Sequence, residues 1–314
     1  MTTPALAGPS MGFVILSHSN PDQVLRLVRT LNRLYGDPPI VCHHDESRSP
    51  APRDVPANVR FVRPSLVTGW AKWSVVEAFL AALRLLYASN GPRWFTLLSG
   101  ADYPVMRAEQ VLRTLDEGGF DAHVDAWRIG DCSRDVITGK RRNPHLLHFD
   151  SPDNRTVKRR HYIKAQLWVP IIRRDPRLRL GRYTIHLPFD ARTPFRPDFC
   201  CYYGDHWFTG NARAAATLLA PTDDHLALRR YLKRRTQPDE IYYQTVLMND
   251  PSLSISIDNK RFAEWNGGGA HPMTLTSDEV PRALASGAFF ARKFAPDDPI
   301  LDTIDAALAR PATA

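Results

Sequence analysis

The chain has 314 residues, 43% of them hydrophobic, which is enough for one large core or two fused lobes. Its formal net charge of +8 suits anionic ligands such as nucleotide diphosphates, and is equally typical of a basic protein with no such ligand. The four cysteines form no CxxC pair, which excludes a zinc framework, and no apolar run is long enough to cross a bilayer.

The first half of the chain alternates short apolar runs with amphipathic stretches. The runs typical of strands lie at residues 12–17, 39–43, 59–62, 94–98 and 120–124. Helical spacing follows a start signal at residues 20–22 and recurs over residues 73–87 and 108–117. This alternation predicts an α/β fold with a mainly parallel central sheet flanked by helices.

The second half begins with an irregular region. Residues 125–200 are rich in Arg, Pro and Asp and show little periodicity, which is typical of a functional loop. Helices are predicted over residues 212–219, 240–247 and 301–308. Because no repeat or linker occurs, we expect a single domain over residues 1–314 with an insertion at about 125–200.

Polar segments directly follow three of the predicted strands. They are residues 17–20, 43–47 and 99–102. In open parallel sheets, ligands bind beyond the carboxyl ends of the strands, so these segments are candidates for lining a site. Polar loops also follow strands in α/β proteins without any such site.

Several common site motifs are absent. The sequence lacks GxGxxG after the first strand, a P-loop, HExxH, GxSxG and an evident Asp-x-Asp motif. If phosphates bind here, basic side chains must therefore replace a metal ion. Arg292 and Lys293 are suited to that task because they lie among phenylalanines rather than in an open charged run.

A candidate general base follows Pro238. Glu240 is predicted near a helix start, where a carboxylate either caps the helix or removes a proton from an attacking hydroxyl. One well-placed carboxylate is sufficient for a displacement that inverts an anomeric centre. Tryptophans at loop–strand junctions, such as Trp70 and Trp207, suit stacking against sugar rings, although core packing explains such residues equally well.

Taken in order, these motifs resemble the core-2/I-branching N-acetylglucosaminyltransferase and peptide O-xylosyltransferase family (glycosyltransferase family 14), especially its bacterial members. The resemblance extends from about residue 13 to 294 and is weakest between about 125 and 195. The segments that carry it are LSHSNP (16–21), HHDES (43–47), WAKWSVVEA (70–78), LLSGADYP (97–104), GDHWF (204–208), PDEIYYQTVL (238–247), DNKRFAEW (258–265) and FFARKF (289–294).

The resemblance implies a GT-A-type fold and an inverting transfer of xylose or N-acetylglucosamine from a UDP-sugar to an acceptor hydroxyl, with β linkage. It implies no metal or other cofactor. The acceptor is a glycan, a protein or a small molecule, with no nucleic acid partner and no transmembrane segment. A further expectation is a cytoplasmic location, because the cysteines and membrane anchor of the animal enzymes are absent.

By matching motif position, Glu240 resembles the catalytic base of the family. The residues matched to donor binding are His18, Asp45, Arg261, Trp265, Arg292 and Lys293. The residues matched to the sugar and acceptor region are Trp70, Asp102, Arg160, His206 and Trp207.

The sequence departs from the family pattern at His206, where relatives carry other polar residues, and in the diphosphate site. It also leaves two rival functions open. No second diphosphate-binding Arg is evident between Trp265 and Lys293, so Arg292 or Arg261 is the candidate substitute. The first rival is a protein that binds polyanions through its basic clusters. The second is a degenerate transferase fold kept as a glycan-binding module.

Overall fold

The computed structural model describes residues 8–129, 194–233, 235, 237–265 and 271–309, and the backbone of three strands between 166 and 186. At its centre is a seven-stranded sheet. In spatial order its strands are β13 (Ile255–Ser256), β6 (Ala122–His123), β12 (Thr209–Asn211), β4 (Trp94–Ser99), β1 (Met11–Ser17), β2 (Ile40–His44) and β3 (Val59–Phe61).

The sheet is mainly parallel, as the sequence predicted. Strand β12 is the exception, because it pairs antiparallel with both β4 and β6. Strand β1 is apolar and almost fully buried, as expected for a central strand covered on both faces. Its side chains alternate: Val14 packs into one core cluster, and Phe13 and Ile15 pack into the other.

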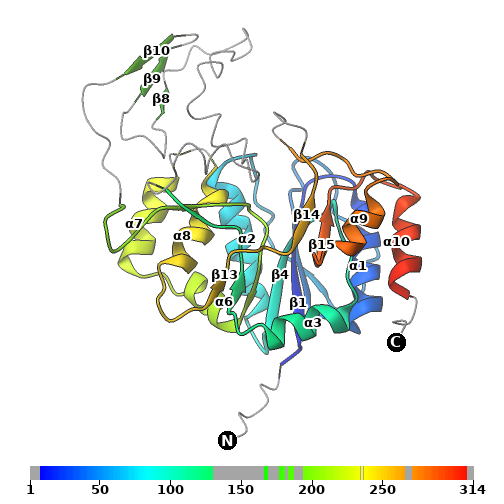
Figure 1. The fold of residues 1–314 in the computed structure, drawn as a ribbon. Helices are drawn as coiled ribbons and strands as arrows, with labels where there is room; N and C mark the ends of the chain where they lie inside the picture. Colours follow the sequence, from blue (N-terminus) through cyan, green and yellow to red (C-terminus); the bar gives the residue numbers. More distant parts are fainter. Residues whose placement is uncertain are drawn as a thin grey trace, which may run out of the picture.

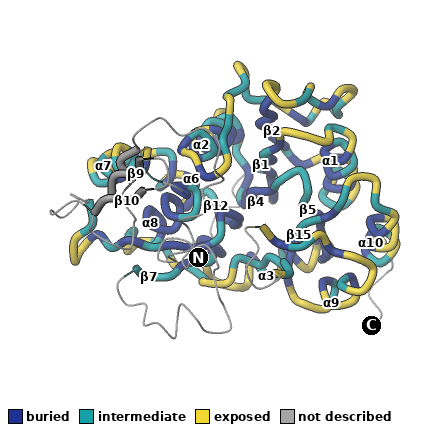
Figure 2. The backbone as a smooth tube through the Cα atoms, turned by 90° about the horizontal axis from the view of Figure 1, so that it is seen from above, coloured by how far each residue is buried: buried dark blue, intermediate teal, exposed yellow. Residues whose placement is uncertain are grey.

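Helices cover both faces of this sheet (Figure 1). One core cluster includes apolar residues of α2 (Trp73–Leu86), α6 (Ala212–Leu219), α7 (Asp223–Leu232) and α8 (Tyr242–Met248). The other includes those of α1 (Pro21–Tyr35), α3 (Ala108–Glu117), α9 (Val280–Ala285) and α10 (Ile300–Ala309). Seen from above, the central strands are buried and exposed residues lie at the periphery (Figure 2).

Smaller sheets complete the fold. The strands β14 (Arg261–Ala263), β15 (Phe290–Arg292) and β5 (Asp102–Pro104) form one of them, with β15 in the middle. Its register places Arg292 directly opposite Asp102. The other strands are β7 (Trp127–Arg128), which pairs with β11 (Tyr202–Tyr203), and the antiparallel set β8 (Gln166–Trp168), β9 (Arg177–Leu180) and β10 (Tyr183–His186).

One helix prediction was wrong in detail. The predicted helix over residues 240–247 is a 3₁₀ turn, η2 (Pro238–Glu240), followed by α8. Ile241 separates the two because its φ of −131° is far from helical. Glu240 therefore ends a separate turn and does not begin the helix. Most of the predicted insertion at 125–200 lies outside the described residues, so the single-domain organisation stays a prediction.

Candidate functional site

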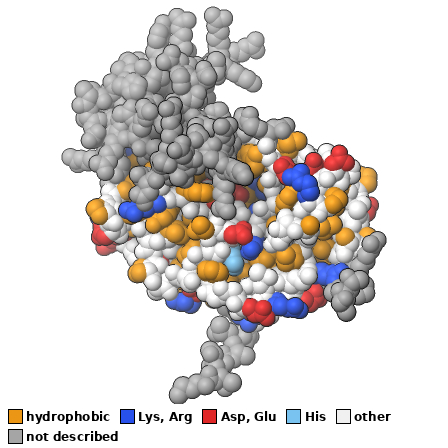
Figure 3. Space-filling model, in the orientation of Figure 1, with side chains coloured by type: hydrophobic (Ala, Val, Ile, Leu, Met, Phe, Trp, Pro, Cys, Tyr) orange, Lys and Arg blue, Asp and Glu red, His pale blue; other side chains and the backbone are white. Residues whose placement is uncertain are grey.

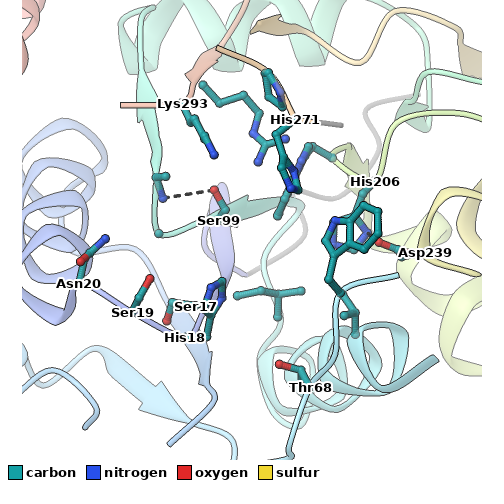
Figure 4. A pocket seen from close by; sticks show the side chains of 18 of the residues that line it. Ser17, His18, Ser19, Asn20, Thr68, Ser99, His206, Asp239, His271 and Lys293 are labelled. Carbon is teal, nitrogen blue, oxygen red and sulfur yellow. Dashed lines mark hydrogen bonds and ion pairs between the residues drawn. The ribbon is translucent and has the colours of Figure 1, made fainter. Parts of the chain in front are cut away.

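A cavity of about 680 Å³ lies beyond the carboxyl ends of β1, β2 and β4. This is the edge of a parallel sheet at which ligands bind. The three polar segments predicted after strands all contribute to its wall, together with residues from the second half of the chain (Figure 4). The lining residues are 16–20, 23, 43, 48, 68–71, 75, 78, 99–101, 205–207, 239–240, 265, 271–272, 274 and 292–296.

One wall of the cavity carries two cations. The guanidinium of Arg292 lies 4.5 Å from the ring centroid of Trp207, and its Nε donates to Asp102 Oδ1 at 3.1 Å. Lys293 follows it and points into the cavity (Figure 4). Within the part of the chain that the structure describes, the Lys293 ammonium has no hydrogen bond or ion pair. It is therefore available to an anionic ligand.

Another part of the wall carries Glu240. The Tyr203 hydroxyl donates a hydrogen bond to Glu240 Oε2, and Gln237 Nε2 donates to the same oxygen at 3.0 Å. Burial, together with the neighbouring charge of Asp239, raises the pKa of Glu240 well above its usual value. A carboxyl group held in this way has the proton affinity that a general base needs.

A close backbone contact fixes the turn that carries Glu240. The Gly204 N–H donates to the Glu240 carbonyl oxygen at 2.9 Å. A Cβ at position 204 would lie 1.6 Å from the Asp125 carbonyl oxygen, so only glycine allows this approach. The GDHWF segment thus positions the candidate base as well as the cavity residues Asp205, His206 and Trp207.

His206 lies beside a second carboxyl group. Its Nδ1 is 3.9 Å from Asp239 Oδ2, and the imidazole is only 7% exposed (Figure 4). Burial lowers the pKa of His206 to about 3 and raises that of Asp239 to about 7. The imidazole is therefore neutral at physiological pH.

The rim of the cavity is aromatic. Trp70 is 62% exposed and Trp265 is 39% exposed, which is unusual for side chains of this size. Trp70 meets His271 edge-to-face, with ring centroids 5.6 Å apart. His18 also lines the cavity, from the loop after β1. These positions suit contacts with a ring-shaped ligand.

Three residues predicted to bind ligand do not line the cavity, so the prediction of direct contact does not hold for them in this arrangement. Asp102 is buried and accepts hydrogen bonds from Ser99 and Arg292. It therefore orients two residues that line the cavity without lining it itself. The partly buried Arg261 donates to the carbonyl oxygens of Leu97 and Phe208, across the ends of two strands. The third is Asp45. Arg160 lies outside the described residues.

Asp45 holds the segment that contributes Thr68 to the cavity. Its carboxylate is fully buried and accepts hydrogen bonds from Ser47 and from the backbone and hydroxyl of Thr68. Burial raises the pKa of Asp45, but these hydrogen bonds outweigh it and keep the pKa below its usual range. The role that the structure gives Asp45 is to position a loop.

Replacing Asp45 by alanine is expected to lower the free energy of unfolding at pH 7 by about 1–3 kcal/mol, because its donors lose a buried acceptor. A lowered pKa means that this contribution is complete above the ordinary pKa and is lost as the pH falls through the pKa of the folded state. Urea denaturation at pH 7 and in acid measures both effects. The exposed Glu117→Ala is the control. An equal, small loss in both variants would contradict the role.

Sequence reasoning missed several cavity residues, among them residues with ionisable side chains, and one residue that supports the base. Asp205, Asp239 and His271 line the cavity, and Tyr203 holds Glu240 from behind. Asp239 and Asp205 lie within segments that carry the family resemblance, next to the predicted site residues Glu240 and His206. That adjacency was the one sequence feature that could have indicated them. No local pattern indicates Tyr203, because β11 reaches Glu240 only through tertiary packing.

Two kinds of feature are absent from the described residues. No cluster of three or more His, Cys, Asp or Glu side chains there is arranged to hold a metal ion. None of the helices in that part of the chain combines the length and apolarity required to span a membrane.

The fold and cavity define an α/β protein that binds its ligand at the carboxyl edge of a mainly parallel sheet. Within that class, the chain belongs to the Core-2/I-Branching enzyme family, whose model matches residues 12–286. This confirms the resemblance and the GT-A-type fold. The match ends shortly before Arg292 and Lys293, so the two cations lie just beyond it.

Curated relatives agree with the family assignment. The chain is 27% identical to Beta-glucuronosyltransferase GlcAT14B of Arabidopsis thaliana over 95% of its own length and 66% of the relative. It is 26% identical to Beta-glucuronosyltransferase GlcAT14A of the same plant, over 79% and 50% of the two chains. It is 24% identical to human Xylosyltransferase 1, over 76% and 23%. The chain thus spans between about a quarter and two thirds of the length of these relatives.

Proposed function

We propose that the chain is an inverting, metal-independent glycosyltransferase that uses a UDP-sugar as donor and forms a β linkage. The observation that carries this proposal is the presence of two cations, Arg292 and Lys293, and a partly buried candidate base, Glu240, in one cavity. Family membership and relatives named as glucuronosyl- and xylosyltransferases support it.

In the proposed reaction, Glu240 removes the proton of an acceptor hydroxyl as its oxygen attacks the anomeric carbon. The bond from that carbon to the diphosphate breaks, and the electron pair leaves with UDP. Lys293 and Arg292 stabilise the charge that develops on the diphosphate. Asp102 holds Arg292 in the orientation that this requires.

For the sugar, we propose a neutral unit, xylose or N-acetylglucosamine. In a direct displacement, the sugar lies between the cations and the base. The wall on the base side carries the carboxyl groups of Asp205, Asp239 and Glu240. A glucuronic acid carboxylate placed beside them would be repelled by any of these groups that is ionised. The acceptor is proposed to be a glycan, a protein or a small molecule that contacts the aromatic rim.

The test measures UDP release by the purified protein with UDP-xylose, UDP-N-acetylglucosamine and UDP-glucuronic acid, each with and without EDTA. We expect release with one of the two neutral donors, unchanged by EDTA. Release that EDTA abolishes would contradict metal independence. Release only with UDP-glucuronic acid would contradict the choice of sugar and favour the activity named for the plant relatives.

The rival polyanion-binding function has less support. Where the described surface is visible in Figure 3, Lys and Arg are scattered among Asp and Glu and form no continuous basic patch. Oligonucleotide binding with a steep salt dependence would favour that rival. UDP binding without turnover of any donor would favour a glycan-binding module on a degenerate transferase fold. The cytoplasmic location stays a prediction from the sequence.

A further inference from the structure

The turn η2 presents two consecutive carboxyl groups to the cavity, and the proposed reaction uses only one of them. Both Asp239 and Glu240 line the cavity. A third carboxyl group, that of Asp205, lines the same wall. Carboxyl groups that neighbour one another in one cavity do not ionise independently, because each charge disfavours the next.

Asp239 differs from Glu240 in how it is held. Glu240 receives hydrogen bonds from Tyr203 and Gln237, which support its charged form. Asp239 Oδ1 is buried and has no hydrogen-bond partner among the described residues, and its Oδ2 is 3.9 Å from the neutral imidazole of His206. Burying a carboxyl oxygen without a hydrogen-bond donor costs free energy, so its presence here calls for an explanation.

We propose that Asp239 is a positioning residue that acts through Glu240: its buried carboxyl group, adjacent in η2, makes Glu240 a stronger base. This inference rests on the proposed role of Glu240. The two carboxyl groups then titrate as an interacting pair, and Glu240 takes the proton of the acceptor hydroxyl. Asp239 itself contacts neither the acceptor nor the leaving group.

The surroundings of η2 add negative charge and little positive charge. The charge of Asp125, in the segment after β6, raises the pKa of Glu240. The charge of Asp205, in the segment before β12, raises the pKa of both Asp239 and Glu240. The nearest elements otherwise contribute neutral phenols, Tyr203 from β11 and Tyr243 from α8.

Two charged groups farther from η2, Glu77 and Arg292, already have hydrogen-bond or ion-pair partners. On α2, which packs against η2, Glu77 accepts a hydrogen bond from Trp73 and pairs with Lys233. On β15, Arg292 is hydrogen-bonded to Asp102. Its charge lowers the pKa of Asp205 and of His206, the two groups beside η2. Asp239 is thus a negative neighbour of Glu240 that one substitution can remove.

The experiment compares Asp239→Asn with the wild-type chain and with Asp278→Asn, which removes an exposed carboxylate outside the cavity. The pH dependence of UDP release, with the donor that supports turnover, is the first readout. In Asp239→Asn, the acidic limb is expected to move to lower pH by about one unit or more. Turnover on the alkaline plateau is expected to fall, because a weaker base accepts the proton less readily. An unshifted limb would overturn the proposal.

A second readout does not depend on activity. Carboxyl ¹³C resonances of labelled glutamate report the titration of Glu240, which is assigned by its absence from Glu240→Gln. We expect its midpoint to fall in Asp239→Asn and to stay unchanged in Asp278→Asn; an unchanged midpoint in Asp239→Asn would overturn the inference. If Asp239→Asn does not fold, the wild-type titration decides, because a single Glu240 step near the ordinary pKa of about 4.3 would exclude an interaction between the two carboxyl groups. Absence of UDP release with every donor would count against the proposed function alone.

Discussion

Replacing Glu240 by glutamine is expected to lower turnover by roughly two to four orders of magnitude, the range for loss of a positioned base. Glutamine keeps the shape of the side chain but has no carboxylate to take the proton of the acceptor hydroxyl. The effect is expected in kcat, with little change in UDP affinity, because Glu240 and the two cations occupy different parts of the wall.

The measurement is steady-state UDP release, together with UDP binding by calorimetry. Gln237→Ala is the matched control, because it removes one donor to Glu240 Oε2 and keeps the carboxylate. The control is expected to lose far less turnover than Glu240→Gln. If turnover in Glu240→Gln is near the wild-type level, the assignment of the base is wrong.

Replacing Lys293 by alanine is expected to weaken both UDP binding and turnover. The ammonium lies in the cavity with no partner among the described residues, so a diphosphate gains its full charge-assisted contact. Loss of one such stabilising group costs about 10²–10³ in turnover when it acts on charge that develops in the transition state. Lys293→Arg is expected to restore part of both quantities, because it keeps the charge.

UDP affinity measured by calorimetry for wild type, Lys293→Ala and Lys293→Arg separates this role from a structural one. As a control for net charge, Lys233→Ala removes a mostly exposed cation that is paired with Glu77, outside the cavity. The phosphate role of Lys293 would be refuted by a UDP affinity in Lys293→Ala equal to that of wild type.

The contrast between Arg292 and Lys293 bears on the missing second arginine of the family. Arg292 is held by Asp102 and stacks on Trp207, so it is already oriented before any ligand arrives. Arg261, the other candidate, does not line the cavity and donates to backbone carbonyl oxygens instead. Of the two substitutes that the sequence left open, the geometry supports Arg292.

The sequence by itself determined the layered α/β fold, because apolar strands buried on both faces and amphipathic helices are periodic patterns that neighbouring residues carry. It also identified the strand-end segments that reach the cavity and the residues Glu240, Arg292 and Lys293 within it. These residues reach the cavity, as predicted, because each belongs to a local motif whose order along the chain is informative; their chemical roles stay predictions.

Tertiary structure alone decided which predicted residues face the cavity and which support it from behind. Asp45, Asp102 and Arg261 stand in informative motifs, yet their side chains turn into buried hydrogen bonds with segments distant in sequence. The same holds for Tyr203, which meets Glu240 across 37 positions of the chain. Side-chain direction at the edge of a sheet depends on packing between distant segments, and a linear pattern of residue types does not contain that information.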